Sequence, residues 1–141
     1  YWVLIFSYPE NSHTQDYRQK ILDLVNAQRA KYGLTALEMG NDALTAAAQT
    51  RAEEIAVVNS HVRPDGSKCF TVLKDYGVTD TPTGENAAWG SVSPKEVVNA
   101  WMNSEGHRAN ILNPEARKMS VGYYYNSTST WGHQWIQIFT K

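Results

Sequence analysis

The chain has 141 residues, of which 42% are hydrophobic, so it is long enough for one domain with a real core and too short for two. Its 13 basic and 14 acidic residues give a formal net charge of -1, and no run of like charge exceeds two residues. This pattern argues against nucleic acid and against an anionic membrane surface as partners. A single cysteine, Cys69, excludes an internal disulfide and a multi-cysteine zinc site.

The first sixteen residues, 1–16, are predicted to be an N-terminal extension or linker. Residues 1–6 are an apolar run, and turn-forming residues interrupt the sequence between 8 and 12. The run is either an edge strand or linker sequence, and the pattern leaves both open. The chain begins without Met, so we expect a fragment or a mature form. The folded domain is predicted to span residues 17–141, with no stretch near the roughly 18 apolar residues of a membrane span.

Helices are predicted in the first half of the domain. Apolar residues at helical spacing predict an amphipathic helix from Thr14 to Tyr32, with Thr14 as a possible N-cap. Asn41 can cap a second helix that ends near Asn59. Its predicted buried face is rich in alanine, which permits close approach to another element, and consists of Leu44, Ala47, Ala48, Arg51, Ala52 and Ile55. Turn chemistry follows at 61–67, and a short helix is predicted at 68–76.

The second half mixes helices and strands. Residues 85–89 are interpreted as a brief buried strand, with a loop as the alternative because glycine lies at both ends. Ser93 is followed by a proline and, three residues on, by a glutamate, which is typical of a helix start. A further short helix is predicted at 106–112, and two strands at 118–126 and 131–140 should pair as an antiparallel hairpin. This order predicts an α+β fold in which helices cover a small antiparallel sheet.

The candidate functional residues are two histidines and two glutamates. His61 and His107 each lie at an irregular junction, and neutral imidazole is a good ligand for borderline metals. Glu85 is flanked by small residues that favour its burial, and a buried carboxylate needs a cation, a metal or several hydrogen-bond donors. A histidine could satisfy it, and a purely structural role in tying the loop together is the alternative.

Glu105 is harder to place, because residues two apart on a regular helix point to nearly opposite sides and His107 is two residues away. A carboxylate in the first turn of a helix is also favoured by the helix dipole, whatever its function. His133 alternates with two tryptophans along a predicted strand, which favours a packing role. Nothing in the sequence near Cys69 indicates an activated thiol, and no short motif for a catalytic nucleophile or a bound phosphate is present.

Several short motifs, taken in their order and spacing, resemble those of a known family. They are Asn26-Ala27-Gln28-Arg29, Ser60-His61 with Arg63-Pro64-Asp65-Gly66-Ser67, Gly84-Glu85-Asn86, the stretch from Trp101 through Gly106-His107 to Asn113, Val121-Gly122-Tyr123, and Trp135-Ile136-Gln137. The sequence resembles the CAP superfamily (cysteine-rich secretory proteins, antigen 5 and pathogenesis-related proteins), in its short bacterial form. The resemblance covers nearly everything after Tyr17, and the chain lacks the C-terminal cysteine signature of eukaryotic members.

The resemblance implies a three-layer α/β/α sandwich, a secreted or cell-surface location, and a cleft lined by two histidines and two acids. Matched residue by residue, the histidines are His61 and His107 and the first acid is Glu85. In the family the second acid falls in or near the helix that carries the tryptophan of this motif, so the resemblance makes Glu105, which follows Trp101 closely, the candidate here.

Three functions follow as hypotheses. The first is a secreted binding or interaction module whose cleft weakly binds a divalent cation, with zinc as the expected ion, through His61 and His107. The second is a metal-assisted hydrolase with a peptide or cell-wall substrate, which needs a carboxylate as general base. The third is lipid or sterol binding, which the resemblance allows and for which the aromatic and apolar segments at 70–78 and 123–125 are the local candidates. The natural ligand is expected to be extracellular.

Overall fold

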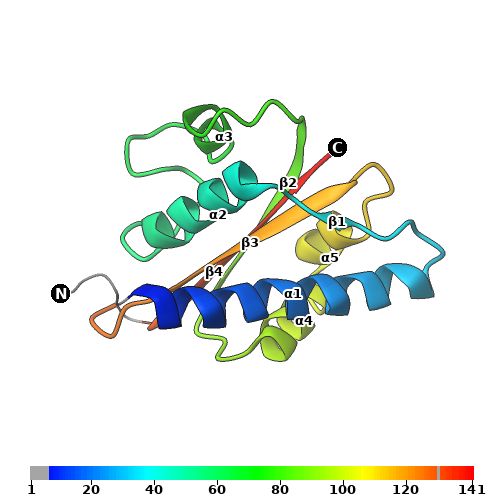
Figure 1. The fold of residues 1–141 in the computed structure, drawn as a ribbon, viewed down its shortest axis with the longest axis horizontal. Helices are drawn as coiled ribbons and strands as arrows, with labels where there is room; N and C mark the ends of the chain where they lie inside the picture. The colour runs from blue at the N-terminus through cyan, green and yellow to red at the C-terminus, as the bar shows by residue number, and fades with distance from the viewer. Residues whose placement is uncertain (1–6, 130) are drawn as a thin grey trace.

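The computed structural model describes residues 7–129 and 131–141, so the apolar run at 1–6 lies outside the described residues. Five helices and four strands follow one another along this part of the chain (Figure 1). In chain order they are α1 (Ser7–Lys31), β1 (Glu38–Met39), α2 (Asp42–Ile55), α3 (Thr71–Asp75), β2 (Pro82–Trp89), α4 (Pro94–Met102), α5 (Glu105–Ile111), β3 (Lys118–Tyr125) and β4 (His133–Thr140).

The four strands form one sheet in the order β1-β3-β4-β2. β4 pairs antiparallel with both β3 and β2, so the predicted hairpin is confirmed and the brief strand at 85–89 is extended to Pro82–Trp89. β1 pairs parallel with β3 through only two residues, which is too short for an alternating pattern to reveal it in the sequence. β2 therefore lies at one edge of the sheet. It contacts the helix α5, and Glu85 on β2 contacts His61 of the loop that follows α2.

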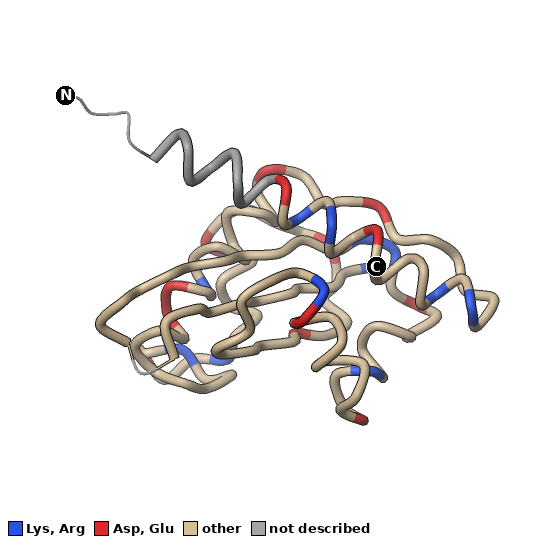
Figure 2. Tube along the Cα trace, turned by 90° about the horizontal axis from the view of Figure 1, so that it is seen from below, with Lys and Arg blue, Asp and Glu red and all other residues tan. Residues whose placement is uncertain are grey.

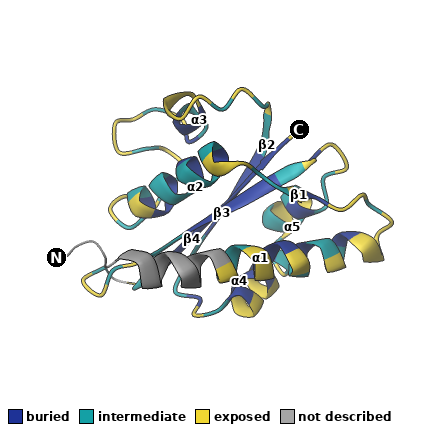
Figure 3. Ribbon diagram, in the orientation of Figure 1, coloured by how far each residue is buried: buried dark blue, intermediate teal, exposed yellow. Residues whose placement is uncertain are grey.

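Helices cover both faces of the sheet, and the α+β class with its three-layer arrangement is confirmed (Figure 1). Alternating residues of β4 supply the two cores: Trp135 and Phe139 pack with α1 and α4, whereas Ile136 and Ile138 pack with α2. Figure 3 shows the sheet as the most continuously buried part of the molecule, with exposed residues on the outer faces of the helices.

Helix boundaries differ from the predictions mainly at α1 and α2. α1 begins at Ser7, not at Thr14, because Pro9 falls in the first turn, where its missing N–H group is not needed. α2 ends at Ile55, earlier than predicted, and Val57 and Val58 continue as a turn hydrogen-bonded to Glu54.

Two of the three predicted helix caps are confirmed, whereas Thr14 lies inside α1 and does not cap it. The Asn41 side chain accepts a 3.0 Å hydrogen bond from the backbone N–H of Leu44, and Ser93 accepts one of 3.2 Å from the N–H of Glu96. Because each cap fixes the first turn of its helix, α2 and α4 start at defined points on opposite sides of the sheet.

Charged residues are distributed along the whole described trace, with acidic and basic positions interspersed (Figure 2). Within residues 7–129 and 131–141, no helix combines the length and the apolar character that crossing a membrane requires.

Candidate functional site

Glu85 is the centre of the candidate site. It lies on β2 with a side chain that is 1% exposed, and its carboxylate receives two hydrogen bonds from Arg51 of α2, from Nε at 2.9 Å and from Nη2 at 3.1 Å. Burial alone would raise the pKa of Glu85, but the hydrogen bonds from His61 and Arg51 and their positive charge outweigh burial and lower it. Glu85 is therefore an ionised carboxylate, as its burial with a guanidinium requires.

His61 completes this network from the loop after α2. Its Nδ1 lies 2.7 Å from Oε1 of Glu85, and because an ionised carboxylate only accepts hydrogen bonds, Nδ1 carries the proton. The hydrogen bond to Glu85 raises the pKa of His61 in spite of partial burial. The other ring nitrogen, Nε2, has no hydrogen-bond partner among the described residues, and the side chain is 56% exposed.

Arg63 fixes the loop that carries His61. Its guanidinium donates to Glu54 of α2 at 2.7 Å, to Asp75 of α3 at 2.8 Å and to the Thr71 hydroxyl at 3.0 Å. The loop closes on itself through a bridge between Val62 and Lys68. His61 is thus held between two helices, which limits the orientations available to its ring.

His107 approaches from the other side of β2, on α5. Its Nδ1 lies 2.9 Å from the Ser104 hydroxyl, and its backbone carbonyl accepts a 3.1 Å hydrogen bond from Asn86 of β2. Asn110 donates to the Asn86 side chain at 2.9 Å and so ties α5 to β2 a second time. Partial burial, and secondly the charge of His61, lower the pKa of His107.

Glu105 lies apart from this network. It is exposed in the first turn of α5, and no hydrogen bond or ion pair in the described part of the chain joins it to Glu85, His61 or His107. The structure thus brings His61 and Glu85 into direct contact, whereas the inclusion of His107 and Glu105 in the same cleft stays a prediction. His133 bonds to the Tyr123 hydroxyl at 2.6 Å among aromatic rings, in keeping with the packing role predicted for it.

Two residues of the site were missed by sequence reasoning. Arg51 was predicted to lie on the alanine-rich buried face of α2. This position already indicated a role in the site, because an arginine on a buried helix face requires an acidic partner. Cys69 gave no such signal. Its sulfur lies within 4.8 Å of a carboxylate oxygen of Glu85 and of a ring nitrogen of His61. Burial, and secondly the negative charge of Glu85, raise the pKa of Cys69 to about 11, so it is a thiol and not an activated nucleophile.

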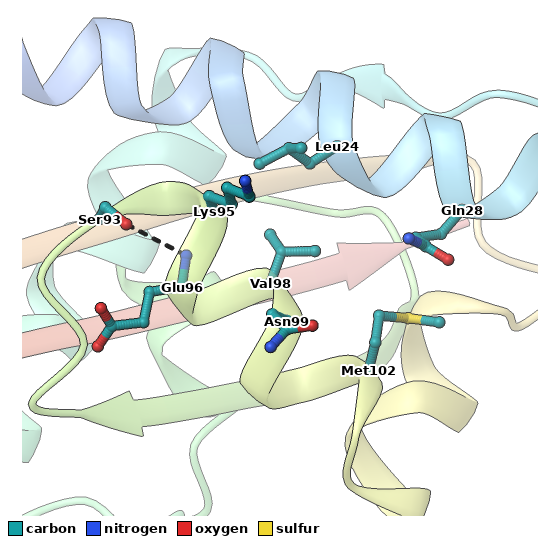
Figure 4. A pocket seen from close by; sticks show the side chains of 8 residues that line it. All are labelled: Leu24, Gln28, Ser93, Lys95, Glu96, Val98, Asn99 and Met102. Atoms are coloured by element: carbon teal, nitrogen blue, oxygen red, sulfur yellow. Dashed lines mark hydrogen bonds between the residues drawn. The ribbon is translucent and has the colours of Figure 1, made fainter.

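A separate groove lies between α1 and α4, on the other side of the sheet from the Arg51 network (Figure 4). Its volume is about 510 Å³, and its walls combine apolar and polar side chains. The apolar ones are Leu24, Val98 and Met102, and the polar ones are Gln28, Ser93, Lys95, Glu96 and Asn99. Among the described side chains, neither His61 nor His107 lines it, and neither do the segments 70–78 and 123–125.

Comparison with known proteins agrees with this architecture. The Bacillus subtilis protein YkwD is 39% identical over 127 residues, which cover 89% of this chain and 49% of YkwD. A crystal structure of an extracellular protein with an SCP domain from Bacillus anthracis matches with a TM-score of 0.79 and 26% identity, over 91% of this chain and 41% of that chain. An outer surface protein of Borrelia burgdorferi matches with a TM-score of 0.71 and 25% identity, over 87% and 90% respectively.

The chain thus spans about half the length of YkwD, and it resembles domains that occur in proteins described as extracellular or outer-surface. The sequence profile of the cysteine-rich secretory protein family, CAP, matches residues 22–139, which is most of the described structure. This chain belongs to the cysteine-rich secretory protein (CAP) family.

Proposed function

We propose that this CAP domain works outside the cell as a binding module whose cleft, formed by His61, Glu85 and His107, holds a divalent cation weakly. The observation that carries the proposal is the hydrogen bond between Nδ1 of His61 and the buried Glu85 carboxylate. Metal-binding histidines in proteins characteristically donate their second ring N–H to a carboxylate, which fixes the tautomer and leaves the other nitrogen for the ion. The extracellular part of the proposal rests on the two bacterial relatives of known structure.

The donor set fits such an ion. His107 has its Nδ1 next to the Ser104 hydroxyl, so its Nε2 is available in the same way as that of His61. Two imidazole nitrogens suit zinc and similar borderline ions. Tetrahedral zinc takes four ligands, so a site with two protein nitrogens leaves the remaining positions to water or to a bound partner. A cation held in this way would bind weakly and could bridge the domain to an extracellular ligand.

A hydrolytic role is less well supported by this geometry. A general base needs a carboxylate that is free to accept a proton, and its pKa should lie near the operating pH. The Glu85 carboxylate is occupied by Arg51 and His61, and these contacts lower its pKa. Glu85 is therefore suited to orienting His61 rather than to removing a proton from water.

Zinc titration followed by calorimetry tests the cation site. We expect low-affinity binding to the parent domain and no measurable binding to the double variant His61→Ala/His107→Ala, since both proposed ligands are removed. The matched control is His133→Ala, which removes a histidine that bonds to Tyr123 away from the cleft and should leave the affinity unchanged. Zinc binding that persists in the double variant would contradict the proposal.

The groove between α1 and α4 supports a second candidate, the binding of a small lipid or sterol. The observation in its favour is the volume of about 510 Å³ beside Leu24, Val98 and Met102, which is within the range of small-ligand sites. This location differs from both segments that the sequence suggested for a lipid.

A fluorescent fatty acid or sterol tests this candidate by saturable binding. Met102→Lys should weaken the binding at least about tenfold, since burying an ammonium group against an apolar ligand costs more than the 1.4 kcal/mol that corresponds to that factor. Val57→Lys is the control, because Val57 is 80% exposed and does not line the groove. Binding that does not saturate, or equal affinity in both variants, would remove the groove as a ligand site.

A further inference from the structure

Cys69 is a buried residue whose side chain has two polar neighbours, His61 and Glu85. A residue that only fills space in a core would not need them. The Cys69 side chain is buried, with the residue 7% exposed, just before α3. The ligand atoms that Cys69, His61 and Glu85 offer all lie within 4.8 Å of one another. Since Cys69 is the only cysteine of the sequence, the cluster combines one sulfur, one nitrogen and one oxygen donor from three different parts of the chain.

This donor set matches the chemistry of a thiophilic divalent cation. Zinc binds sulfur at about 2.3 Å and imidazole nitrogen at about 2.0 Å, so a tetrahedral ion holds these two atoms about 3.6 Å apart. The observed spacing of up to 4.8 Å requires the donors to approach by roughly 1 Å. His61 lies on a loop and is partly exposed, so its ring offers both the adjustment and a route for the ion.

We propose that Cys69, His61 and Glu85 form a binding site for a thiophilic divalent cation. The thiol proton and the proton between His61 and Glu85 leave to solvent, metal bonds form to sulfur, nitrogen and oxygen, and no electron is transferred. Arg51 keeps its hydrogen bond from Nε to Oε2, so Glu85 remains anchored, while the bond from Nη2 to Oε1 is given up as Oε1 turns to the ion. This site shares His61 with the proposed cation cleft, but here His61 would bind through Nδ1, which now bonds to Glu85, and not through Nε2. The sulfur of Cys69 and the oxygen of Glu85 take the place of His107, so the two sites are alternatives for one ion.

Cadmium is the probe that separates this site from a histidine-only site, because a cadmium–thiolate bond produces an ultraviolet charge-transfer band that imidazole does not. The intact domain should develop this band in proportion to added cadmium until one ion per chain is bound. Cys69→Ser, which nearly preserves the size of the side chain, should abolish the band completely. His61→Ala should weaken cadmium binding at least about tenfold, as expected for the loss of a ligand. Circular dichroism of each variant verifies that the fold is kept.

His107→Ala makes the two proposals distinguishable, because His107 belongs to the cleft and not to the thiolate cluster. We expect the cadmium band to survive in this variant with less than a twofold change in affinity. No band in the intact domain, together with zinc binding that depends on His61 and His107, would overturn the thiolate site and leave the proposed function standing. A band that is unchanged in His61→Ala would also overturn it, because the metal would then be reacting with a lone thiol.

Discussion

Replacing Arg51 with methionine is expected to destabilise the domain by about 3–5 kcal/mol, as measured by urea unfolding. The reason is that Arg51 and Glu85 have side chains that are 0% and 1% exposed, so the substitution leaves a buried carboxylate with His61 as its remaining charged donor. Domains of this size are stable by about 5–15 kcal/mol, so the loss is a large share of the total. The variant should also bind zinc less tightly, because Glu85 no longer holds His61 in a fixed orientation.

The pH dependence of this variant identifies the buried charge as the cause. In the parent domain the pKa of Glu85 is lowered, so its stabilisation is present above the ordinary glutamate pKa and is lost as the pH falls through the lowered value. Without Arg51, burial is expected to raise that pKa, so the variant regains stability as Glu85 takes up a proton. The difference in unfolding free energy between parent and variant should therefore shrink on acidification.

Two further variants complete this test. The double variant Arg51→Met/Glu85→Gln should be more stable than Arg51→Met alone, because a neutral amide costs less to bury than an unpaired carboxylate. Arg117→Met is the control, since Arg117 is exposed and, among the described residues, donates only to backbone carbonyls, and it should change the stability by about 0.5 kcal/mol or less. An equal loss of stability in acid and at neutral pH would assign the effect to packing.

The layers of the fold followed from local pattern, because each main element has its own sequence signature. Asn41 and Ser93 were predicted as the caps of α2 and α4, and the segments 118–126 and 131–140 were predicted as the paired strands that became β3 and β4. The predicted start of α1 was wrong because Pro9 lies among turn-forming residues, which normally indicate an interruption. A proline is compatible with a helix when it falls in the first turn, but no local pattern locates that turn.

The site was predictable only in part, since contacts between distant segments leave little trace in a single sequence. Glu85 was predicted to need a positive or hydrogen-bonding partner, and His61 is one of its partners, as proposed. Arg51 is the second partner of Glu85. Its position on a helix face does not indicate which strand it will contact in the fold. The position of Cys69 beside both depends on how the loop after α2 folds back, which Arg63 fixes through Glu54 and Asp75.

A close approach between a helix and the sheet explains why α2 brings Arg51 so near to Glu85. At Gly122 of β3, an added Cβ atom would lie 2.1 Å from the backbone oxygen of Ala48 on α2, which is far inside van der Waals contact. Next to this point the Gln49 side chain bonds to both backbone groups of Tyr123, at 2.8 and 3.0 Å. The alanine-rich face of α2, predicted to allow close approach, therefore rests directly on the strand backbone.

Gly122→Ala is accordingly expected to destabilise the domain by about 3 kcal/mol or more, because a rigid backbone atom cannot move aside as a side chain does. α2 would have to lift from β3, which breaks the Gln49 bonds and moves Arg51 relative to Glu85. Urea unfolding measures the first effect, and zinc calorimetry on the folded fraction measures the second as weaker binding.

Gly106→Ala is the matched control, since nothing lies within 4 Å of its added Cβ and its position in α5 favours alanine, so the stability of this variant should be unchanged or slightly higher. Equal stability of the two glycine variants would show that α2 does not depend on contact with the backbone at Gly122, and the link between this contact and the Arg51 network would then be wrong.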